Sequence, residues 1–267
     1  SRPSLLSVVI RASNMDTDMP CPVAASRVCE LRVADDGYVY NLPEFESWYP
    51  SDGHERWQEA EVLPETPTMP PGLRVDQVEQ TLVSAVLDEI LPHFPSSEER
   101  SGSRHRSAVE IGWTYERAPE SSAAESWRSV QAVKGLPLAS FPKVRELVAR
   151  AMSKLSPCSP NREDRLNISC LLYSPGQSIT WHADRPYAYT DEVFGCVLFN
   201  TSDSCLQFLE AKGGKLTHRY VLPEVPGSCF VQQGEARYGW KHGVPTLKTG
   251  ERLSVTWRWF LDDAVLE

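Results

Sequence analysis

The stretch that decides the fold is Ile179-Thr180-Trp181-His182-Ala183-Asp184, which is answered much farther along the chain by His242. Side chains alternate between the two faces of a strand, so residues i and i+2 point the same way. An H-x-D at a strand end therefore aims both side chains at one point. Two imidazoles and one carboxylate are the ligands of a facial triad that holds Fe(II) and leaves other positions open. We expect His182, Asp184 and His242 to form such a site, although with six His in the chain an H-x-D is also an ordinary surface pair.

A second stretch, Arg252-Leu253-Ser254-Val255-Thr256-Trp257-Arg258, alternates polar and apolar residues as a strand does. The alternation places Arg252, Ser254 and Arg258 on one face. A guanidinium presents a fork of donors that matches a carboxylate. A dicarboxylate such as 2-oxoglutarate would offer one group to each Arg, whereas without a metal site opposite this would be a strand face exposed to water.

In combination these residues resemble the AlkB-like Fe(II)/2-oxoglutarate-dependent dioxygenases. The similarity covers about residues 109–260. Its motifs follow in order as Tyr173-Ser174-Pro175-Gly176, His182-Ala183-Asp184, the block from Gly234 to Val244, and Arg252 to Arg258. The resemblance implies an α+β protein with a double-stranded β-helix, or jelly-roll, core. It also implies Fe(II), 2-oxoglutarate and O₂ as cofactor and cosubstrates.

The resemblance further assigns roles by position. The metal and catalytic residues would be His182, Asp184 and His242, and the cosubstrate residues would be Tyr173, Arg252, Ser254 and Arg258. Tyr173 and Arg252 would bind the distal carboxylate of 2-oxoglutarate, with Arg258 near its other end. The family usually has Asn two residues before that Tyr, where this chain has Leu171. One side-chain contact to the cosubstrate is therefore absent from the pattern.

Substrate contacts are expected from a lid at about residues 109–135. Aromatic side chains in such a lid can stack on a flipped base, and Trp113 and Tyr115 are the candidates. The alternative is that both lie on one apolar face of a core strand. Nucleic-acid demethylases of the family often carry an acidic residue shortly after the metal Asp. This chain has Arg185 there, which becomes a candidate substrate contact.

The charge of the chain constrains the substrate. A formal net charge of −9 disfavours broad electrostatic capture of nucleic acid, because phosphate binding depends on clustered Lys and Arg. One region before the catalytic motifs is locally basic. It contains Arg100, Arg104, His105, Arg106, Arg117, Arg128 and Lys134. This region could grip a strand of nucleic acid or could simply be a solvated loop.

The chain divides into two parts. Residues 1–71, rich in Pro and acidic side chains, predict an extension with short strands or irregular structure, and residues 72–267 predict the dioxygenase domain. Apolar periodicity predicts one helix that follows Pro71-Gly72 and ends at Pro92, and another over residues 142–155. Short β-like runs follow. They cover 166–173, 178–182, 193–199, 205–209, 219–222, 228–233 and 251–260.

Cysteine usage and hydropathy point to an intracellular protein, cytoplasmic or nuclear. The seven Cys form no C-x-x-C pair, and their number is odd, which fits reduced thiols. No apolar run approaches the ~20 residues that a membrane-spanning helix needs, so we expect no membrane partner.

Three functions are open at this point. The first is oxidative demethylation of alkylated or methylated bases, with DNA or RNA as the partner. The second is an oxygenase of the same fold that hydroxylates or demethylates a protein side chain or a small metabolite. It is compatible with the net charge of −9 and would explain the missing acidic residue after Asp184. The third is a binding protein without activity, which the intact ligand set disfavours.

Overall fold

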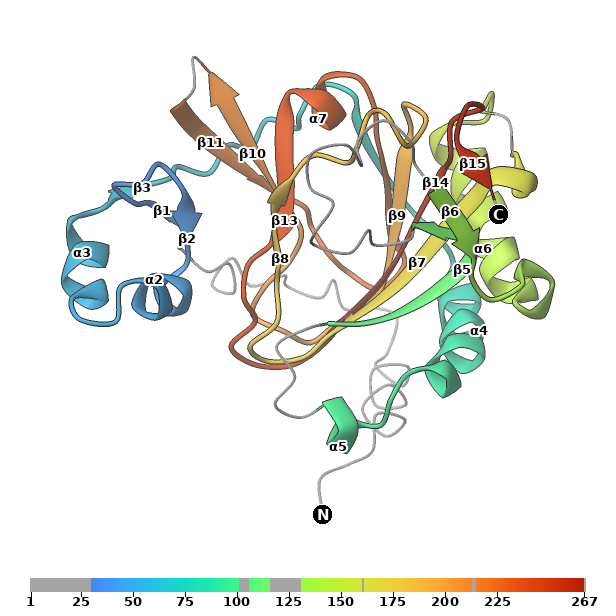
Figure 1. Ribbon diagram of the computed structural model, residues 1–267, viewed down its shortest axis with the longest axis horizontal. Helices are drawn as coiled ribbons and strands as arrows, with labels where there is room; N and C mark the ends of the chain where they lie inside the picture. The colour runs from blue at the N-terminus through green and yellow to red at the C-terminus, as the bar shows by residue number, and fades with distance from the viewer. Residues whose placement is uncertain (1–29, 101–105, 116–130, 160, 213–214, 267) are drawn as a thin grey trace.

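The computed structural model describes residues 30–100, 106–115, 131–159, 161–212 and 215–266, and two antiparallel sheets form its centre (Figure 1). Eight consecutive strands build the two sheets. They are β7 (Leu166–Tyr173), β8 (Ile179–His182), β9 (Val193–Asn200), β10 (Gln207–Lys212), β11 (Lys215–Val221), β12 (Ser228–Gln232), β13 (Trp240–Val244) and β14 (Arg252–Trp259). The order β7-β14-β9-β12 runs through the large sheet, and β11-β10-β13-β8 makes the small sheet. This is a double-stranded β-helix within an α+β protein, as the family resemblance implies.

Four further strands widen the large sheet to eight. They are β4 (Leu73–Gln77), β5 (Ser107–Tyr115), β6 (Gln131–Lys134) and β15 (Val265–Leu266). β4 pairs with β12 at one edge, and β5 pairs with β7 toward the other. Within the large sheet, β15 runs parallel to β6, whereas the other pairings are antiparallel.

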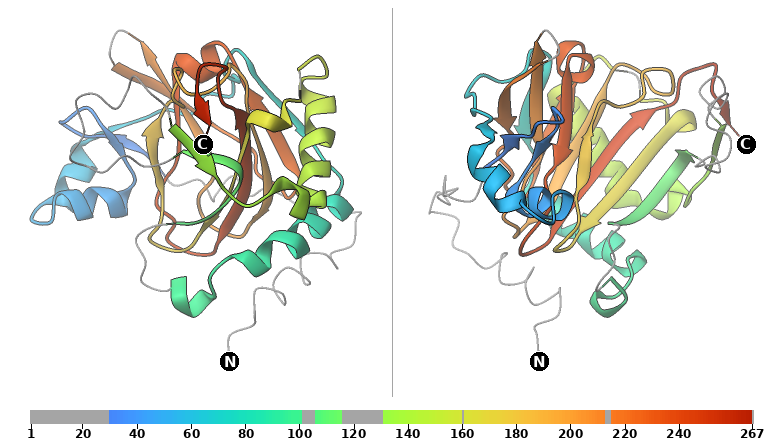
Figure 2. Two further views of the ribbon diagram at one scale, coloured as in Figure 1. Left: turned by 45° about the vertical axis from the view of Figure 1, so that its right-hand side comes forward. Right: turned by 60° about the vertical axis from the view of Figure 1, so that its left-hand side comes forward.

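Two helices cover the outer face of the large sheet, α4 (Gln80–Ile90) and α6 (Pro142–Leu155), and they lie against each other (Figures 1 and 2). Alternation along the strands explains this face. In β7 the apolar set Leu166, Ile168, Cys170 and Leu172 packs with the helices, and in β14 the set Leu253, Val255, Trp257 and Trp259 does the same. The intervening residues of both strands are thereby directed to the inside of the β-helix. There they form one wall of the site.

The helix predicted to follow Pro71-Gly72 is wrong at its start. Residues 73–77 form β4, and the helix begins only at Gln80. Val75 fits the apolar stripe by spacing, yet it lies opposite Phe230 in the strand ladder and is 37% exposed. Pairing with β12 outweighs the local helical periodicity here. The strand β13 is also absent from the predicted runs, because Trp240-Lys241-His242-Gly243-Val244 has a weak β pattern.

Residues 30–62 form a small unit beside the small sheet (Figures 1 and 2). It contains β1 (Arg32–Val33), β2 (Val39–Tyr40), α2 (Leu42–Trp48), α3 (Gly53–Glu59) and β3 (Glu61–Val62). The two helices add to the short strands that the sequence predicts for the extension. Asn41 and Glu44 form a reciprocal capping box at the start of α2. Glu44 also accepts hydrogen bonds from Thr246 of the β-helix, which ties the unit down.

The remaining helical turns are short. They are α5 (Ser97–Arg100), α7 (Glu235–Tyr238) and the 3₁₀ turns Leu91–His93, Leu138–Ser140 and Glu163–Arg165. Within the described ranges, none of the helices is both long and apolar enough to cross a membrane. Burial raises the pKa of the Cys229 thiol to about 11, and the Cys170 and Cys196 thiols are likewise buried with raised pKa values. These thiols are therefore protonated core residues.

Candidate functional site

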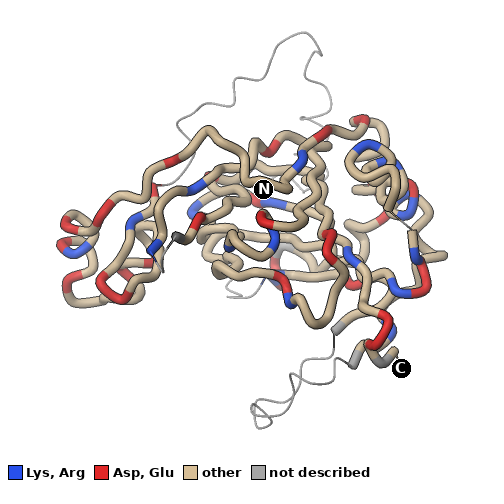
Figure 3. Tube along the Cα trace, turned by 90° about the horizontal axis from the view of Figure 1, so that it is seen from above, with Lys and Arg blue, Asp and Glu red and all other residues tan. Residues whose placement is uncertain are grey.

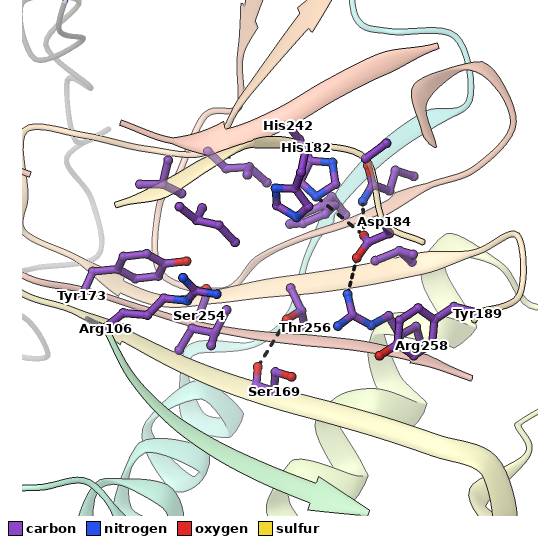
Figure 4. Close-up of a pocket in the computed structure, with 18 of the residues that line it drawn as sticks. Arg106, Ser169, Tyr173, His182, Asp184, Tyr189, His242, Ser254, Thr256 and Arg258 are labelled. Atoms are coloured by element: carbon purple, nitrogen blue, oxygen red, sulfur yellow. Dashed lines mark hydrogen bonds and ion pairs between the residues drawn. The ribbon is translucent and has the colours of Figure 1, made fainter. Parts of the chain in front are cut away.

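The small sheet brings the three expected metal ligands together. His182 ends β8 and lies opposite His242 of β13 in the strand ladder, with the two ring centroids 4.4 Å apart (Figure 4). Asp184 follows two residues after His182 and is 6% exposed. One ligand atom from each of the three side chains lies within 4.8 Å of the others. The i, i+2 spacing and one cross-strand pair are thus enough to assemble the triad.

The protonation states suit a cation. His182 Nδ1 lies 2.7 Å from the carbonyl oxygen of Thr180, so Nδ1 donates and Nε2 keeps its lone pair. Burial lowers the pKa of His242 to about 3, which keeps that ring neutral near pH 7. Burial alone would raise the pKa of Asp184, but the positive charge of the Arg258 guanidinium outweighs burial and lowers that pKa below its ordinary range. One ring nitrogen from each His and one carboxylate fit the donor set of an Fe(II) facial triad.

Other side chains orient the carboxylate of Asp184. Arg258 Nη1 donates to Asp184 Oδ1, and Gln232 Nε2 donates to Oδ2 over 3.3 Å. His242 Nε2 lies 3.6 Å from the same Oδ2. Arg258 is itself fixed, because its Nε donates to Asn167 Oδ1 at 3.1 Å and its guanidinium lies 4.2 Å from the Tyr189 ring centroid. The Asp184 carboxylate is therefore held in place by charge and by hydrogen bonds.

A pocket of about 430 Å³ separates the triad from the large sheet. Its far wall is the inner face of β5, β7 and β14 (Figure 4). Residues that are paired across these strands form rows along the wall, and most of their side chains are polar. From one end to the other, the rows are Tyr173 with Arg252, then Ala108 with Leu171 and Ser254, then Glu110 with Ser169 and Thr256, and last Gly112 with Asn167 and Arg258. The polar face predicted for the strand from Arg252 to Arg258 thus lines the pocket opposite the metal ligands.

The end of the pocket away from the triad is positively charged. Tyr173 is 1% exposed, and its ring lies 5.4 Å from the Arg252 guanidinium and 5.9 Å from that of Arg106. Arg252 donates from Nη1 to Ser254 Oγ at 2.9 Å. Three of these residues, Tyr173, Arg252 and Ser254, are among those that the family resemblance assigns to 2-oxoglutarate. Their charges and donors would match a carboxylate.

Glu224 reduces the positive charge at this end of the pocket. Its side chain is 1% exposed and receives Arg252 Nη2 at 2.6 Å and Arg252 Nε at 2.9 Å. Asn200 Nδ2 and the Leu206 amide also donate to Glu224. The Arg252 charge is thus already compensated inside the protein. Arg106, by contrast, has no hydrogen-bond partner for its Nε among the described residues, and no described carboxylate forms an ion pair with it.

Of the three expected substrate contacts, the structure places one at the pocket and one away from it. Arg185 is exposed at the pocket. Trp113 does not line it, because the indole donates to the Asp164 carbonyl at 2.8 Å and stacks under Lys134 at 5.7 Å. Tyr115 lies at the end of β5, but its side chain and residues 116–130 of the expected lid fall outside the described residues.

The basic region is only partly available to a ligand. Arg100 is 4% exposed and donates to Glu251 at 2.6 Å and to Ser174 at 2.7 Å. Its charge is therefore paired inside the protein and is not available to a ligand. Arg106 lines the pocket, and Lys134 lies over Trp113. The other four residues of that region, Arg104, His105, Arg117 and Arg128, lie outside the described residues.

Glu110, Glu224 and Gln232 belong to the site without being predicted from the sequence, and Arg106 is predicted only as part of the basic region. Arg106 and Glu110 stand at i and i+4 of an alternating stretch, so a strand prediction there would have placed both on one face. Glu224 lies in a connection between strands. Its pairing with Arg252 has no local signal in the sequence.

Comparisons with known proteins match two parts of the chain. A family described as "Domain of unknown function (DUF8284)" matches residues 30–61, which is the small unit beside the β-helix. The tRNA (carboxymethyluridine(34)-5-O)-methyltransferase alkbh8 of Xenopus tropicalis is 28% identical over 190 residues, or 70% of this chain and 27% of that protein. An uncharacterized protein of Acanthamoeba polyphaga mimivirus is 30% identical over 96 residues, or 32% of this chain and 44% of that protein. The chain thus spans less than half the length of either relative.

Among solved structures, a Pseudomonas putida prolyl-4-hydroxylase is similar with a TM-score of 0.41 and 15% identity. The match covers 71% of this chain and 93% of that one.

Proposed function

We propose that this protein is an Fe(II)/2-oxoglutarate-dependent oxygenase that oxidatively demethylates alkylated or methylated nucleic-acid bases. The assignment as an oxygenase rests on one observation. His182, Asp184 and His242 line the same pocket as the positively charged end formed by Arg106 and Arg252. Both ends line one pocket, so a cosubstrate with two carboxylates would place one end at the metal ligands and the other at Tyr173 and Arg252.

Each part of the pocket has a task in this chemistry. Fe(II) held by the triad, with 2-oxoglutarate and O₂, would supply the oxidation of a substrate C–H bond. Arg106, Arg252 and Ser254 would bind and orient the distal carboxylate, and Arg258 fixes the direction of Asp184. Apolar residues between the two sheets limit the access of water to the reacting groups. They are Ile179, Val193, Leu206, Phe230 and Val244.

The nucleic-acid substrate is supported by the similarity to the frog protein, whose name states an action on tRNA. A second candidate is a protein side chain or a small metabolite. The net charge of −9 favours it, and Figure 3 shows basic and acidic residues intermixed along the described trace. Arg100 also supports this second candidate, because its ion pair with Glu251 leaves its charge unavailable to a nucleic-acid phosphate.

Succinate formation tests the proposal. The purified protein with Fe(II), ascorbate and 2-oxoglutarate is offered methylated DNA and RNA oligonucleotides, methylated peptides and a panel of small metabolites. We expect a methylated oligonucleotide to stimulate succinate release and to lose its methyl group as formaldehyde. Stimulation by a peptide or metabolite alone would favour the second candidate, and absence of succinate under all conditions would contradict the oxygenase.

A further inference from the structure

Glu110 is an acidic residue of the inner wall that belongs neither to the metal-ligand group nor to the expected cosubstrate contacts. It lies on β5 in the row with Ser169 and Thr256. Its Oε2 accepts a hydrogen bond from Ser169 Oγ at 2.7 Å and one from Asn167 Nδ2 at 3.4 Å. Two donors from the neighbouring strand β7 therefore fix the direction of this carboxylate within the pocket.

The other oxygen of Glu110 is free to accept. Among the described residues, no donor within hydrogen-bond distance and no Lys, Arg or His within ion-pair distance accompanies Oε1. The Arg258 guanidinium is directed instead to Asp184 and Asn167. A half-buried carboxylate without a counter-charge is costly unless a ligand supplies a donor. The pocket lining thus includes an acceptor with a fixed direction and no internal partner.

The position of Glu110 sets it apart from the cosubstrate. Arg106 and Glu110 are four residues apart on one strand face, which is roughly 13 Å at a rise of about 3.3 Å per residue. The wall is therefore positive beside Tyr173 and negative at Glu110, in the row next to that of Arg258. A dianionic cosubstrate is attracted to the first end and repelled from the second. The group that meets Glu110 belongs to a different ligand.

We propose that Glu110 is a specificity-determining residue that accepts a hydrogen bond from an N–H group of the substrate base. This inference rests on the proposed function. A base that presents an amino or protonated edge to Glu110 is favoured, and a base that presents a carbonyl there is rejected, because two acceptors would then face each other. The position also supplies the acidic side chain that the sequence lacks after Asp184, from a different strand.

A matched pair of oligonucleotides tests this role of Glu110. The two differ only in one base, 3-methylcytosine or 3-methyluracil, which carry the same methyl position but an amino group or a carbonyl at C4. The wild type should demethylate 3-methylcytosine with a kcat/KM at least about tenfold above that for 3-methyluracil, as expected for one hydrogen bond to a charged group. Glu110→Gln should reduce this ratio by about tenfold, because its amide can donate to the carbonyl.

Control variants separate base selection from folding. Glu55→Gln makes the same chemical change at an exposed position of α3 and should leave the ratio unchanged. Thermal unfolding of Glu110→Gln should match the wild type, so that a changed ratio reflects base selection and not a loss of folded protein. Ser169→Ala, which removes one of the two donors to Oε2, should shift the ratio in the same direction by a smaller factor.

The possible failures are distinct. An unchanged ratio in Glu110→Gln, with an active wild type, overturns the role of Glu110 alone. So does an equal loss on both bases together with loss of substrate-independent succinate, because that pattern marks a structural role. If the wild type forms succinate but demethylates neither oligonucleotide, base selection by Glu110 is overturned together with the nucleic-acid substrate. Absence of succinate altogether contradicts the oxygenase itself.

Discussion

Arg106 and Arg252 both lie beside Tyr173, but their replacement by Gln should have different effects. Arg252→Gln should mainly lower the stability of the protein, and Arg106→Gln should mainly weaken 2-oxoglutarate binding. The Arg252 side chain is 3% exposed and its partner Glu224 is 1% exposed, with N–O distances of 2.6 and 2.9 Å. Arg252→Gln leaves a buried carboxylate uncompensated, so we expect a loss of about 3–5 kcal/mol in the free energy of unfolding. Arg106 has no such partner, and its replacement should change stability by no more than about 0.5 kcal/mol.

For 2-oxoglutarate binding, Arg106→Gln removes a charged donor whose charge no described carboxylate compensates. A hydrogen bond to a charged group contributes about 1.5–3 kcal/mol, which corresponds to a roughly 10- to 150-fold weaker Kd. Urea denaturation gives the stability. Calorimetric titration with 2-oxoglutarate, with Mn²⁺ in place of Fe(II) to prevent turnover, gives the Kd.

Arg150→Gln, at an exposed site on α6, is the matched control and should change neither quantity. An unaltered Kd in Arg106→Gln would refute the assignment of Arg106 to the cosubstrate. Wild-type stability in Arg252→Gln would refute the reasoning on the buried ion pair.

Three further predictions concern the metal ligands and their support. Asp184→Ala should abolish succinate formation and Mn²⁺ binding in titrations, and retained turnover would contradict the assigned ligand set. Arg237 is fully buried and donates to the carbonyls of residues 189 and 191, in the loop after Asp184. Arg237→Met should therefore cost about 1–3 kcal/mol in urea denaturation and weaken the Mn²⁺ affinity; unchanged values would show that the loop needs no such support. A Cβ on Gly195 would overlap the ring of Phe230, so Gly195→Ala should lower the unfolding free energy by about 1–3 kcal/mol. A neutral effect would mean that the ring has room to shift.

Local patterns in the sequence carry much of the fold and the metal site. The alternation of Arg252 to Arg258 predicts both the buried outer face and the polar inner face of β14. The strand-end H-x-D correctly places His182 and Asp184 on one side. His242 is grouped with them because a facial triad needs a second imidazole, but the strand that carries it is not predicted, because β13 has little β pattern of its own. The strand ladder then places His242 opposite His182.

The other features depend on pairings between distant segments. β4 has the apolar spacing of a helix turn and becomes a strand because β12 offers it a partner. Glu224 meets Arg252 across two strand connections, and neither residue carries a local signal of the other. The helices of the N-terminal unit are seven residues each, too short for periodicity to reveal. The Asn41 and Glu44 capping box is the local cue that the sequence offers for α2.

The charges that line the pocket bear on how the proposed cosubstrate would bind without the Asn that AlkB-like proteins usually have two residues before the Tyr. Leu171 occupies that position and lines the pocket without offering a hydrogen bond. Arg252 is neutralised by Glu224, and Arg258 is directed to Asp184. Of Arg106, Arg252 and Arg258, Arg106 is the one that forms no described ion pair, and its guanidinium lies 5.9 Å from the ring centroid of Tyr173, directly before β5. In the proposed oxygenase, this positive charge beside β5 would take the place of the neutral amide that the AlkB-like pattern has two residues before the Tyr. The same strand carries Glu110 toward the substrate, so β5 connects cosubstrate binding with substrate selection.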